Sequence, residues 1–350
     1  MTRLLDRFNN HISKNRKNGT SFSLESLVGS SSSITQAIRK ARKVASIKST
    51  VTLIGETGSG KELFAQGIHN ASSSASQPFI AVNCAAIPET LMESLMMGTV
   101  KGAFSGAIDA PGFVEQAENG TLFLDEINSL SLQLQPKLLR LLQDKTVRRI
   151  GGKIERKINC RIICASNENL FELSEKGQFR EDLLYRLTAV VLDIPPLRER
   201  PEDIPLLAQK IINDFNKAFD LNIREITPEL SEFFKQYDWP GNVRELENII
   251  ESAMSLSNKN DTLLTIEHVP AIIKRRMEKT TSFRHHINTE LFDGENLNAF
   301  LRKCEKEFIE STLAKYKGNV AAAAKQLGIA RQNLHYRLRK LSIEPDIYRG

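Results

Sequence analysis

Short apolar runs alternate with helical patterns over the first 200 residues of the chain. The stretches between these runs have the three- and four-residue spacing of amphipathic helices. Such alternation predicts an α/β fold, a parallel sheet sandwiched by helices, which we assign to residues 23–197. The expected strands are the runs at 50–54, 79–83, 121–124, 161–165 and 190–194.

The rest of the chain shows helical spacing alone. Residues 198–273 are predicted to form an all-helical subdomain, and residues 297–345 a second helical domain. Residues 274–296 are polar and lack a steady period, so we interpret them as a linker. Residues 1–22 are polar and basic with no apolar core, which predicts a short, poorly ordered arm and no secretory signal.

Hydropathy and charge indicate where the protein acts and what kind of partner it binds. No run of 18 apolar residues occurs, so we expect no membrane span and a cytoplasmic location. The net charge is +6, and the segment 297–350 alone holds 11 Lys and Arg against 5 Asp and Glu. The whole excess of positive charge therefore lies in the C-terminal segment, which indicates a nucleic-acid partner.

Two of the four cysteines, Cys160 and Cys164, are spaced like a metal-binding pair. They lie in an apolar run that predicts a strand, where four residues span about 13 Å, too far for two ligands of one metal. We interpret them as buried thiols.

A glycine-rich loop follows the first predicted strand and precedes a helical stretch at 63–69. A strand, loop and helix in this order are typical of a P-loop, in which backbone N–H groups surround phosphate oxygens and a lysine contacts the terminal phosphates. The alternative is a glycine-rich turn without a ligand. We predict an ATP site formed by Gly55, Glu56, Thr57, Gly58, Ser59, Gly60, Lys61 and Glu62.

A second motif lies about 65 residues downstream of the glycine-rich loop. It is an apolar run followed by two acids, the pattern of a buried strand that brings carboxylates to bound phosphates. The apolar run 121–124 ends in Asp125 and Glu126. Asp125 is expected to bind Mg²⁺, and Glu126 to polarise the attacking water. Together the two motifs favour ATP hydrolysis over passive binding.

Three further segments resemble the bacterial sigma-54-dependent transcriptional activators. Residues 102–107 (GAFSGA) are similar to this family's GAFTGA loop, and residues 112–126 and 239–248 match two further signatures. The resemblance covers residues 23–260, with Ser105 in place of the family's threonine and an atypical run at 95–100. It implies an AAA+ ATPase that forms a ring, expected to be a hexamer, and remodels the closed complex of sigma-54 RNA polymerase.

The resemblance also implies roles for single residues. Phe104 and Ser105 would form the tip of a sigma-contact loop, although a buried Phe104 is the alternative. The loop consists of Gly102, Ala103, Phe104, Ser105, Gly106 and Ala107.

The same resemblance implies further catalytic residues. Asn83 would hold Glu126, and Asn167 would sense the γ-phosphate. Arg180 and Arg186 would act as arginine fingers in a neighbouring subunit's site, with structural ion pairs as the alternative. In the lid, Arg244 would sense nucleotide.

The basic segment 317–341 has the pattern of helix, turn and helix. Asn319 is a suitable N-cap, and Gly328 allows a tight turn between the two helices. The segment resembles the Fis-type helix-turn-helix, and a helix from 297 to about 315 would complete the domain and supply a dimer surface. The second helix is expected to present five side chains to the major groove of double-stranded DNA at an upstream site: Arg331, Gln332, Asn333, His335 and Arg337.

Two other functions remain open on these motifs. The chain could be a DNA-binding regulator of ordinary promoters with a vestigial ATPase, or a different AAA+ machine such as a helicase or clamp loader. The intact loop at 102–107 argues against the first, and its combination with a helix-turn-helix argues against the second.

Overall fold

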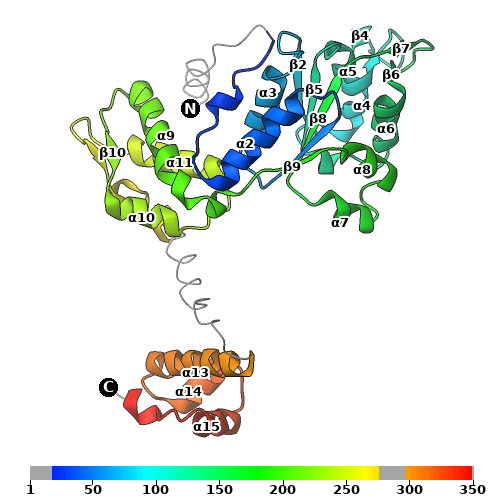
Figure 1. Cartoon of the computed structure of the whole chain (residues 1–350). Coiled ribbons are helices and arrows are strands. Elements are labelled where there is room, and N and C mark those ends of the chain that lie inside the picture. Colours follow the sequence, from blue (N-terminus) through cyan, green and yellow to red (C-terminus); the bar gives the residue numbers. More distant parts are fainter. Residues whose placement is uncertain (1–17, 276–296, 349–350) are drawn as a thin grey trace. The chain divides into compact units, whose positions relative to one another are not determined.

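The computed structural model describes residues 18–275 and 297–348 (Figure 1). The chain divides into two compact units, residues 1–281 and 282–350. In the described residues of both units, no helix is long and apolar enough to cross a membrane.

A five-stranded parallel sheet organises the first unit, in the order β2-β5-β8-β1-β9. Each strand lies within one residue of its predicted bounds, so the α/β prediction is confirmed. The strands are β1 (Val51–Ile54), β2 (Phe79–Asn83), β5 (Thr121–Asp125), β8 (Arg161–Ser166) and β9 (Val191–Asp193).

Alternate residues of the strands face two separate cores, as the pleat of a strand requires. Phe123 of β5 packs with α2 and α3 on one face, whereas Leu122 and Leu124 pack with α4, α6 and α8 on the other. Helices therefore cover both faces of the sheet (Figure 1). They are α2 (Ser32–Ala45), α3 (Lys61–Asn70), α4 (Glu89–Met97), α5 (Phe113–Gln116), α6 (Gln135–Asp144), α7 (Leu170–Glu175) and α8 (Glu181–Leu187), with the short turns η1 (Leu24–Ser26) and η2 (Ile127–Ser129).

Two small hairpins lie beside the sheet and were not predicted. β3 (Gly98–Thr99) pairs with β4 (Ala110–Pro111), and β6 (Thr146–Arg148) pairs with β7 (Glu155–Lys157), both antiparallel. Strands of two or three residues are too short to show an alternating period.

The lid subdomain is mainly helical around one core, in which Trp239 contacts the rings of Phe234 and Tyr237. The prediction of helices alone is wrong at two places, because β10 (Glu225–Ile226) pairs in parallel with β11 (Leu263–Leu264). The helical elements are η3 (Leu197–Glu199), η4 (Pro201–Asp203), α9 (Ile204–Phe219), α10 (Pro228–Gln236), α11 (Asn242–Ser255) and η5 (Ile266–His268).

The predicted arm and linker are described only in part. Asn18 and Thr20 are buried and bond to Asn70 of α3, and Phe79 N donates to Asn18 O at 2.9 Å. The prediction of a poorly ordered arm is therefore wrong for residues 18–22. Residues 1–17 of that arm and 276–296 of the linker lie outside the described residues.

The second unit consists of α13 (Leu297–Lys315), α14 (Val320–Gln326) and α15 (Arg331–Lys340), followed by η7 (Pro345–Tyr348). Gly328 joins α14 to α15 with a φ of +67°, in the left-handed region that favours glycine. Ala323 and Ala324 of α14 pack against Leu334 and Leu338 of α15. The predicted helix, turn and helix are confirmed.

Candidate nucleotide site and nucleic-acid interface

The glycine-rich loop lies between the end of β1 and the start of α3. Gly58 and Gly60 adopt φ angles of +77° and +104°, which only glycine accepts readily. Lys61 begins α3, and its Nζ donates to Gly55 O at 2.7 Å and to Glu56 O at 3.0 Å. The predicted strand, loop and helix are therefore present, with the lysine folded back over the loop.

The two predicted acids lie at the carboxyl end of β5, which β8 separates from β1 in the sheet. Asp125 ends β5, and Glu126 follows it with a left-handed φ of +52°. Burial lowers the pKa of the Lys61 ammonium, and the charges of Asp125 and Glu126 oppose that shift. The two carboxylates therefore lie close enough to Lys61 for their charges to stabilise its ammonium group.

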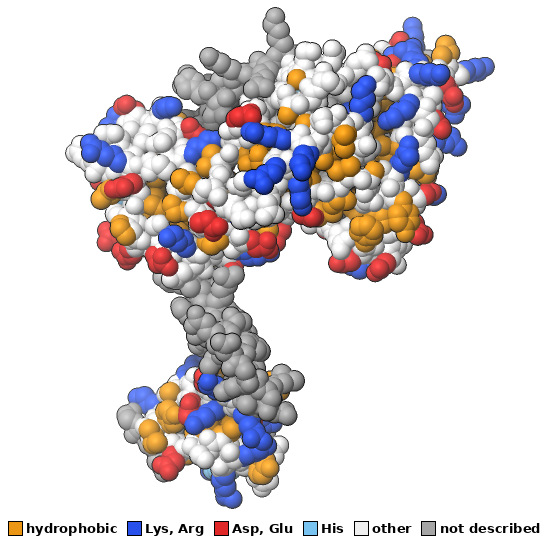
Figure 2. Space-filling model, in the orientation of Figure 1, with side chains coloured by type: hydrophobic (Ala, Val, Ile, Leu, Met, Phe, Trp, Pro, Cys, Tyr) orange, Lys and Arg blue, Asp and Glu red, His pale blue; other side chains and the backbone are white. Residues whose placement is uncertain are grey.

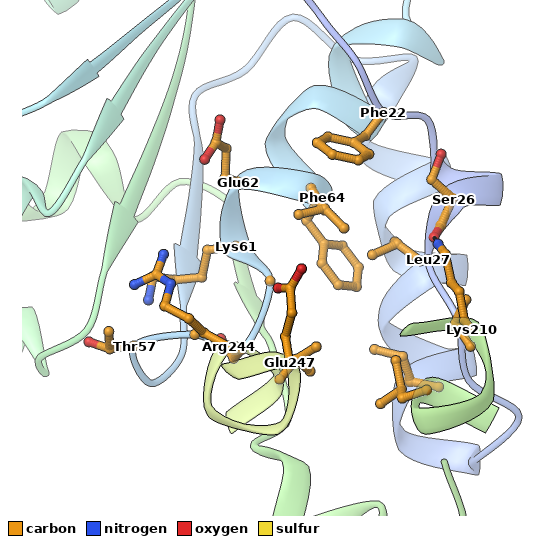
Figure 3. A pocket seen from close by; sticks show the side chains of 18 of the residues that line it. Phe22, Ser26, Leu27, Thr57, Lys61, Glu62, Phe64, Lys210, Arg244 and Glu247 are labelled. Atoms are coloured by element: carbon orange, nitrogen blue, oxygen red, sulfur yellow. Dashed lines mark hydrogen bonds between the residues drawn. The ribbon is translucent and has the colours of Figure 1, made fainter. Parts of the chain in front are cut away.

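These groups line a cavity of about 340 Å³ (Figure 3). Arg244 of α11 points toward the same space as Lys61, and Phe22, Leu27 and Phe64 gather at an apolar end. A cation, left-handed glycines and two carboxylates suit a nucleotide with a divalent cation that prefers oxygen ligands. Of the predicted loop residues, those from 57 to 62 line the cavity, whereas Gly55 and Glu56 do not.

The two predicted asparagines extend the site along the sheet edge. Asn83 ends β2 in register with Asp125, and its Oδ1 accepts from the backbone of Ala85 and Ala86. Asn167 follows β8 and donates to Thr57 Oγ1 at 3.3 Å. The ends of four adjacent strands therefore supply the predicted polar groups.

The two predicted arginine fingers lie elsewhere in the chain. Arg180 is exposed and pairs with Asp182 at 2.7 Å, and the exposed Arg186 donates to Leu142 O at 3.3 Å. Neither lines the cavity of its own chain.

The loop at 102–107 connects β3 to β4. Gly102 and Gly106 have φ angles of +85° and +83°, and Ala107 N donates to Phe104 O at 3.0 Å. The side chain of Phe104 is 53% exposed, which excludes the alternative of a buried phenylalanine. Ile108, 71% exposed, adds a second apolar side chain that no sequence motif indicated.

An ion-pair cluster at the base of this loop was also not predicted. Arg149 forms two hydrogen bonds with Glu115 at 2.6 and 2.8 Å and a third with Asp109 at 2.9 Å. Arg156 donates to the same Glu115 at 2.8 Å. The pKa of Glu115 is lowered, first by its hydrogen bonds with Arg149. The cluster joins the β6–β7 hairpin to the segment that follows the loop.

The five predicted DNA-contacting side chains of α15 are all exposed. Asn319 caps α14 as predicted, because its Oδ1 accepts from the N–H groups of Ala321 and Ala322. Arg337 is also paired with Glu305 of α13. Figure 2 shows Lys and Arg side chains on the visible face of this unit. Tyr336, 66% exposed, lies among the predicted residues and was not singled out.

The cysteines form no metal site in the described part of the chain. Cys84, Cys160 and Cys164 are buried free thiols, and no group of three potential ligands occurs among the described residues. Burial raises the pKa of Cys84 to about 12 and of Cys160 to about 11. The interpretation as buried thiols is confirmed for Cys160 and Cys164.

Comparison with protein families accounts for both units. Residues 27–193 match the model of the sigma-54 interaction domain, and residues 198–285 match the AAA+ ATPase lid domain. Residues 300–341 match the Fis family of bacterial regulatory proteins.

Individual relatives agree with these matches. The transcriptional activator RocR of Bacillus subtilis is 46% identical over 94% of this chain and 71% of its own length. The regulatory protein AtoC of Escherichia coli is 40% identical over 87% of this chain and 65% of its own length. The crystal structure of NtrX from Brucella abortus in complex with ATP has a TM-score of 0.67 at 32% identity, covering 91% of this chain and 70% of NtrX. The chain belongs to the family of sigma-54-dependent transcriptional activators, with an AAA+ domain and a Fis-type DNA-binding domain.

Proposed function

We propose that this protein hydrolyses ATP as an oligomeric ring and uses the energy to remodel closed complexes of sigma-54 RNA polymerase while it is bound to upstream DNA. It acts in the cytoplasm, where polymerase and promoter DNA lie. The single observation that carries the proposal is the convergence of Lys61, Asp125, Glu126 and Arg244 on one cavity, in a chain that also exposes Phe104 on a glycine-flanked loop.

The cavity supports ATP turnover through complementary charges. Lys61 and Arg244 bring two cations to the site of the phosphates, and the glycine loop offers backbone N–H groups at the start of α3. Asp125 would hold Mg²⁺, which when bound neutralises phosphate charge. Glu126 would orient a water and accept its proton. Asn167 donates to Thr57 of the loop and would sense the γ-phosphate.

The exposed loop supports contact with a sigma subunit. Phe104 offers an apolar surface on a hairpin of small residues, and the glycines at 102 and 106 allow the hairpin to change its angle. The cluster of Arg149 and Glu115 at the loop base links it to the neighbouring hairpin. Movement of the loop would then displace the sigma factor so that promoter DNA can open.

The proposal of an oligomeric ring rests on two arginines, Arg180 and Arg186. Both are exposed and lie outside the cavity of their own chain, which supports the proposal that they act in the cavity of a second copy. We propose a hexamer for the active ring, and a dimer formed through α13 of the DNA-binding unit. The second unit would use Arg331, Gln332 and the other exposed side chains of α15 to bind double-stranded DNA.

ATP turnover by Lys61→Ala and Glu126→Gln tests the site. Each change is expected to lower kcat by about 100-fold or more, because each removes a group that stabilises the transition state. Glu232→Gln, a change of an exposed carboxylate on α10, serves as the matched control and should keep wild-type turnover. Full turnover in both site variants would contradict the assignment.

Transcription in vitro separates this function from that of a regulator of ordinary promoters. With purified polymerase, we expect activation with sigma-54 and none with the housekeeping sigma factor. Phe104→Ala should abolish activation while ATP turnover persists. If Phe104→Ala activates as well as the wild type, the loop does not contact sigma-54, and the vestigial-ATPase alternative gains support.

A further inference from the structure

Glu56 brings a negative charge into a loop that we propose to bind phosphate. It follows Gly55 in the loop but does not line the cavity. Its pKa is lowered, first by the hydrogen bonds from Arg198, so the group is ionised at neutral pH. A charged carboxylate in this loop needs a partner, and the structure provides two outside the cavity.

The first partner is Arg198 of η3, at the start of the lid. Its guanidinium donates to both carboxylate oxygens of Glu56, Nη2 to Oε1 at 2.7 Å and Nη1 to Oε2 at 2.8 Å. A bidentate pair of this kind fixes orientation as well as distance. It neutralises the carboxylate beside the phosphate site and ties the loop to the segment that leads into the lid.

The second partner is Asn242, the first residue of α11, which is fully buried. Its Nδ2 donates to Glu56 Oε2 at 3.0 Å and to Thr57 O at 3.1 Å, and its Oδ1 accepts from Leu197 N at 2.7 Å. The side chain of Asn242 therefore bonds to both the loop and η3, and its backbone forms the first residue of the lid helix α11. Its left-handed φ of +52° is a conformation that asparagine tolerates better than most residues.

The helix that these residues hold also carries Arg244. Val243 N donates to Gly58 O at 3.1 Å, so the first turn of α11 lies directly on the loop. A Cβ on Gly58 would meet Gly241 O at 2.2 Å, which shows how close the two backbones are. Arg244 is the next residue and enters the cavity beside Lys61 (Figure 3).

We propose that Glu56, Arg198 and Asn242, which we call the lid anchor, are positioning residues that hold Arg244 over the phosphates and transmit nucleotide binding to the lid. The proposal rests on the proposed ATPase function and deepens it. None of the three touches the cavity, so the lid anchor acts through Arg244.

A double-mutant cycle tests this coupling. Glu56→Gln keeps the size of the side chain but removes its charge, and should lower kcat by about tenfold with a smaller change in KM, because Arg244 loses its fixed place in the transition state. In an Arg244→Ala background, the same change should have little further effect. Glu232→Gln on the lid surface is the control and should leave kcat unchanged in both backgrounds.

The chain also offers a direct optical readout. Trp239 is its only tryptophan, and it is fully buried three residues before Asn242. ADP titration should change the emission of Trp239 in the wild type and in Glu232→Gln. The change should be much smaller in Glu56→Gln and in Arg198→Lys, which cannot form the bidentate pair. This signal reports lid docking without any need for turnover.

The outcomes separate two failures. Wild-type turnover in Lys61→Ala sinks the proposed ATPase function, and the Trp239 response to ADP still tests the lid anchor. Equal losses of kcat from Glu56→Gln with and without Arg244 would show that Glu56 acts independently of Arg244, which overturns the proposal. An unchanged Trp239 response in both Glu56→Gln and Arg198→Lys would also overturn it.

Discussion

The nucleotide site and the helix-turn-helix are built in opposite ways. The nucleotide site collects side chains from four strand ends and the lid, for instance Lys61 and Arg244, which lie far apart in the sequence. The residues predicted to contact DNA all lie on the single helix α15 and are exposed. Chemistry on a substrate needs groups fixed against one another, whereas reading a groove needs one rigid helix with free side chains.

The largest effect should come from the proposed arginine fingers, which we expect to complete the nucleotide site of a second chain. Arg186→Ala is expected to lower kcat by about 10³-fold, as the loss of an arginine finger in trans does. Mixing Arg186→Ala with Glu126→Gln should restore part of the turnover, because each supplies what the other lacks. Turnover is measured for each variant alone and for the mixture. No recovery on mixing would contradict action between subunits.

His69 should make the first unit sensitive to acid. It is fully buried with its Nδ1 2.9 Å from Thr121 Oγ1, and burial lowers its pKa from 6.5 to about 4. The unfolded chain takes up a proton below pH 6.5 and the folded one only near pH 4, so stability is complete above pH 6.5 and falls between these values. We expect a loss on the order of 3 kcal/mol in the free energy of unfolding.

Denaturant unfolding of the wild type and of His69→Gln at pH 7 and pH 4.5 measures this effect. The variant should be less stable at pH 7 but should lose less stability on acidification. Equal losses in the two proteins would assign the acid sensitivity to other groups.

The helix-turn-helix should respond differently, because its side chains act nearly alone. Arg331→Gln should weaken binding to duplex DNA by about tenfold and reduce the slope of log Kd against log salt by about one, as the loss of one phosphate contact does. ATP turnover should not change. Arg302→Gln, an exposed residue of α13, is the control for charge alone. Fluorescence anisotropy with a labelled duplex at several salt concentrations gives both quantities.

The smallest effects concern helix caps in the second unit. Asn319 caps α14 with its side chain, whereas Ala330 at the start of α15 has no side-chain cap. Asn319→Ala should cost about 1 kcal/mol of stability, and Ala330→Ser should stabilise by about 0.5–1 kcal/mol. Thermal unfolding followed by circular dichroism measures both. Shifts of the same sign in the two variants would contradict this account.

The same contrast explains what the sequence could predict. The five sheet strands and the helix-turn-helix were predictable because apolar runs and caps are local signals. The pair of β10 and β11 was not, because two-residue strands show no period. Nor was the contact of Arg149 with Glu115, across 34 residues, because each residue alone looks like a surface charge.

For the side chains of the nucleotide site, the sequence predicted the separate motifs but not how they meet in space. The loop of Lys61 and the acids after β5 follow from strand and helix patterns, but their meeting in one cavity depends on strand order, which a single sequence does not reveal. The lid anchor was hidden for the same reason, since the bonds of Glu56 with the lid join residues that are far apart in the sequence.

Opening of promoter DNA by sigma-54 polymerase tests the central claim most directly. Permanganate footprinting would compare ATP with a non-hydrolysable analogue, for the wild type and for Glu126→Gln. The account predicts unpaired thymines only with wild-type protein and ATP. Equal opening with the analogue, or with Glu126→Gln, would contradict the claim that hydrolysis drives the loop at 102–107.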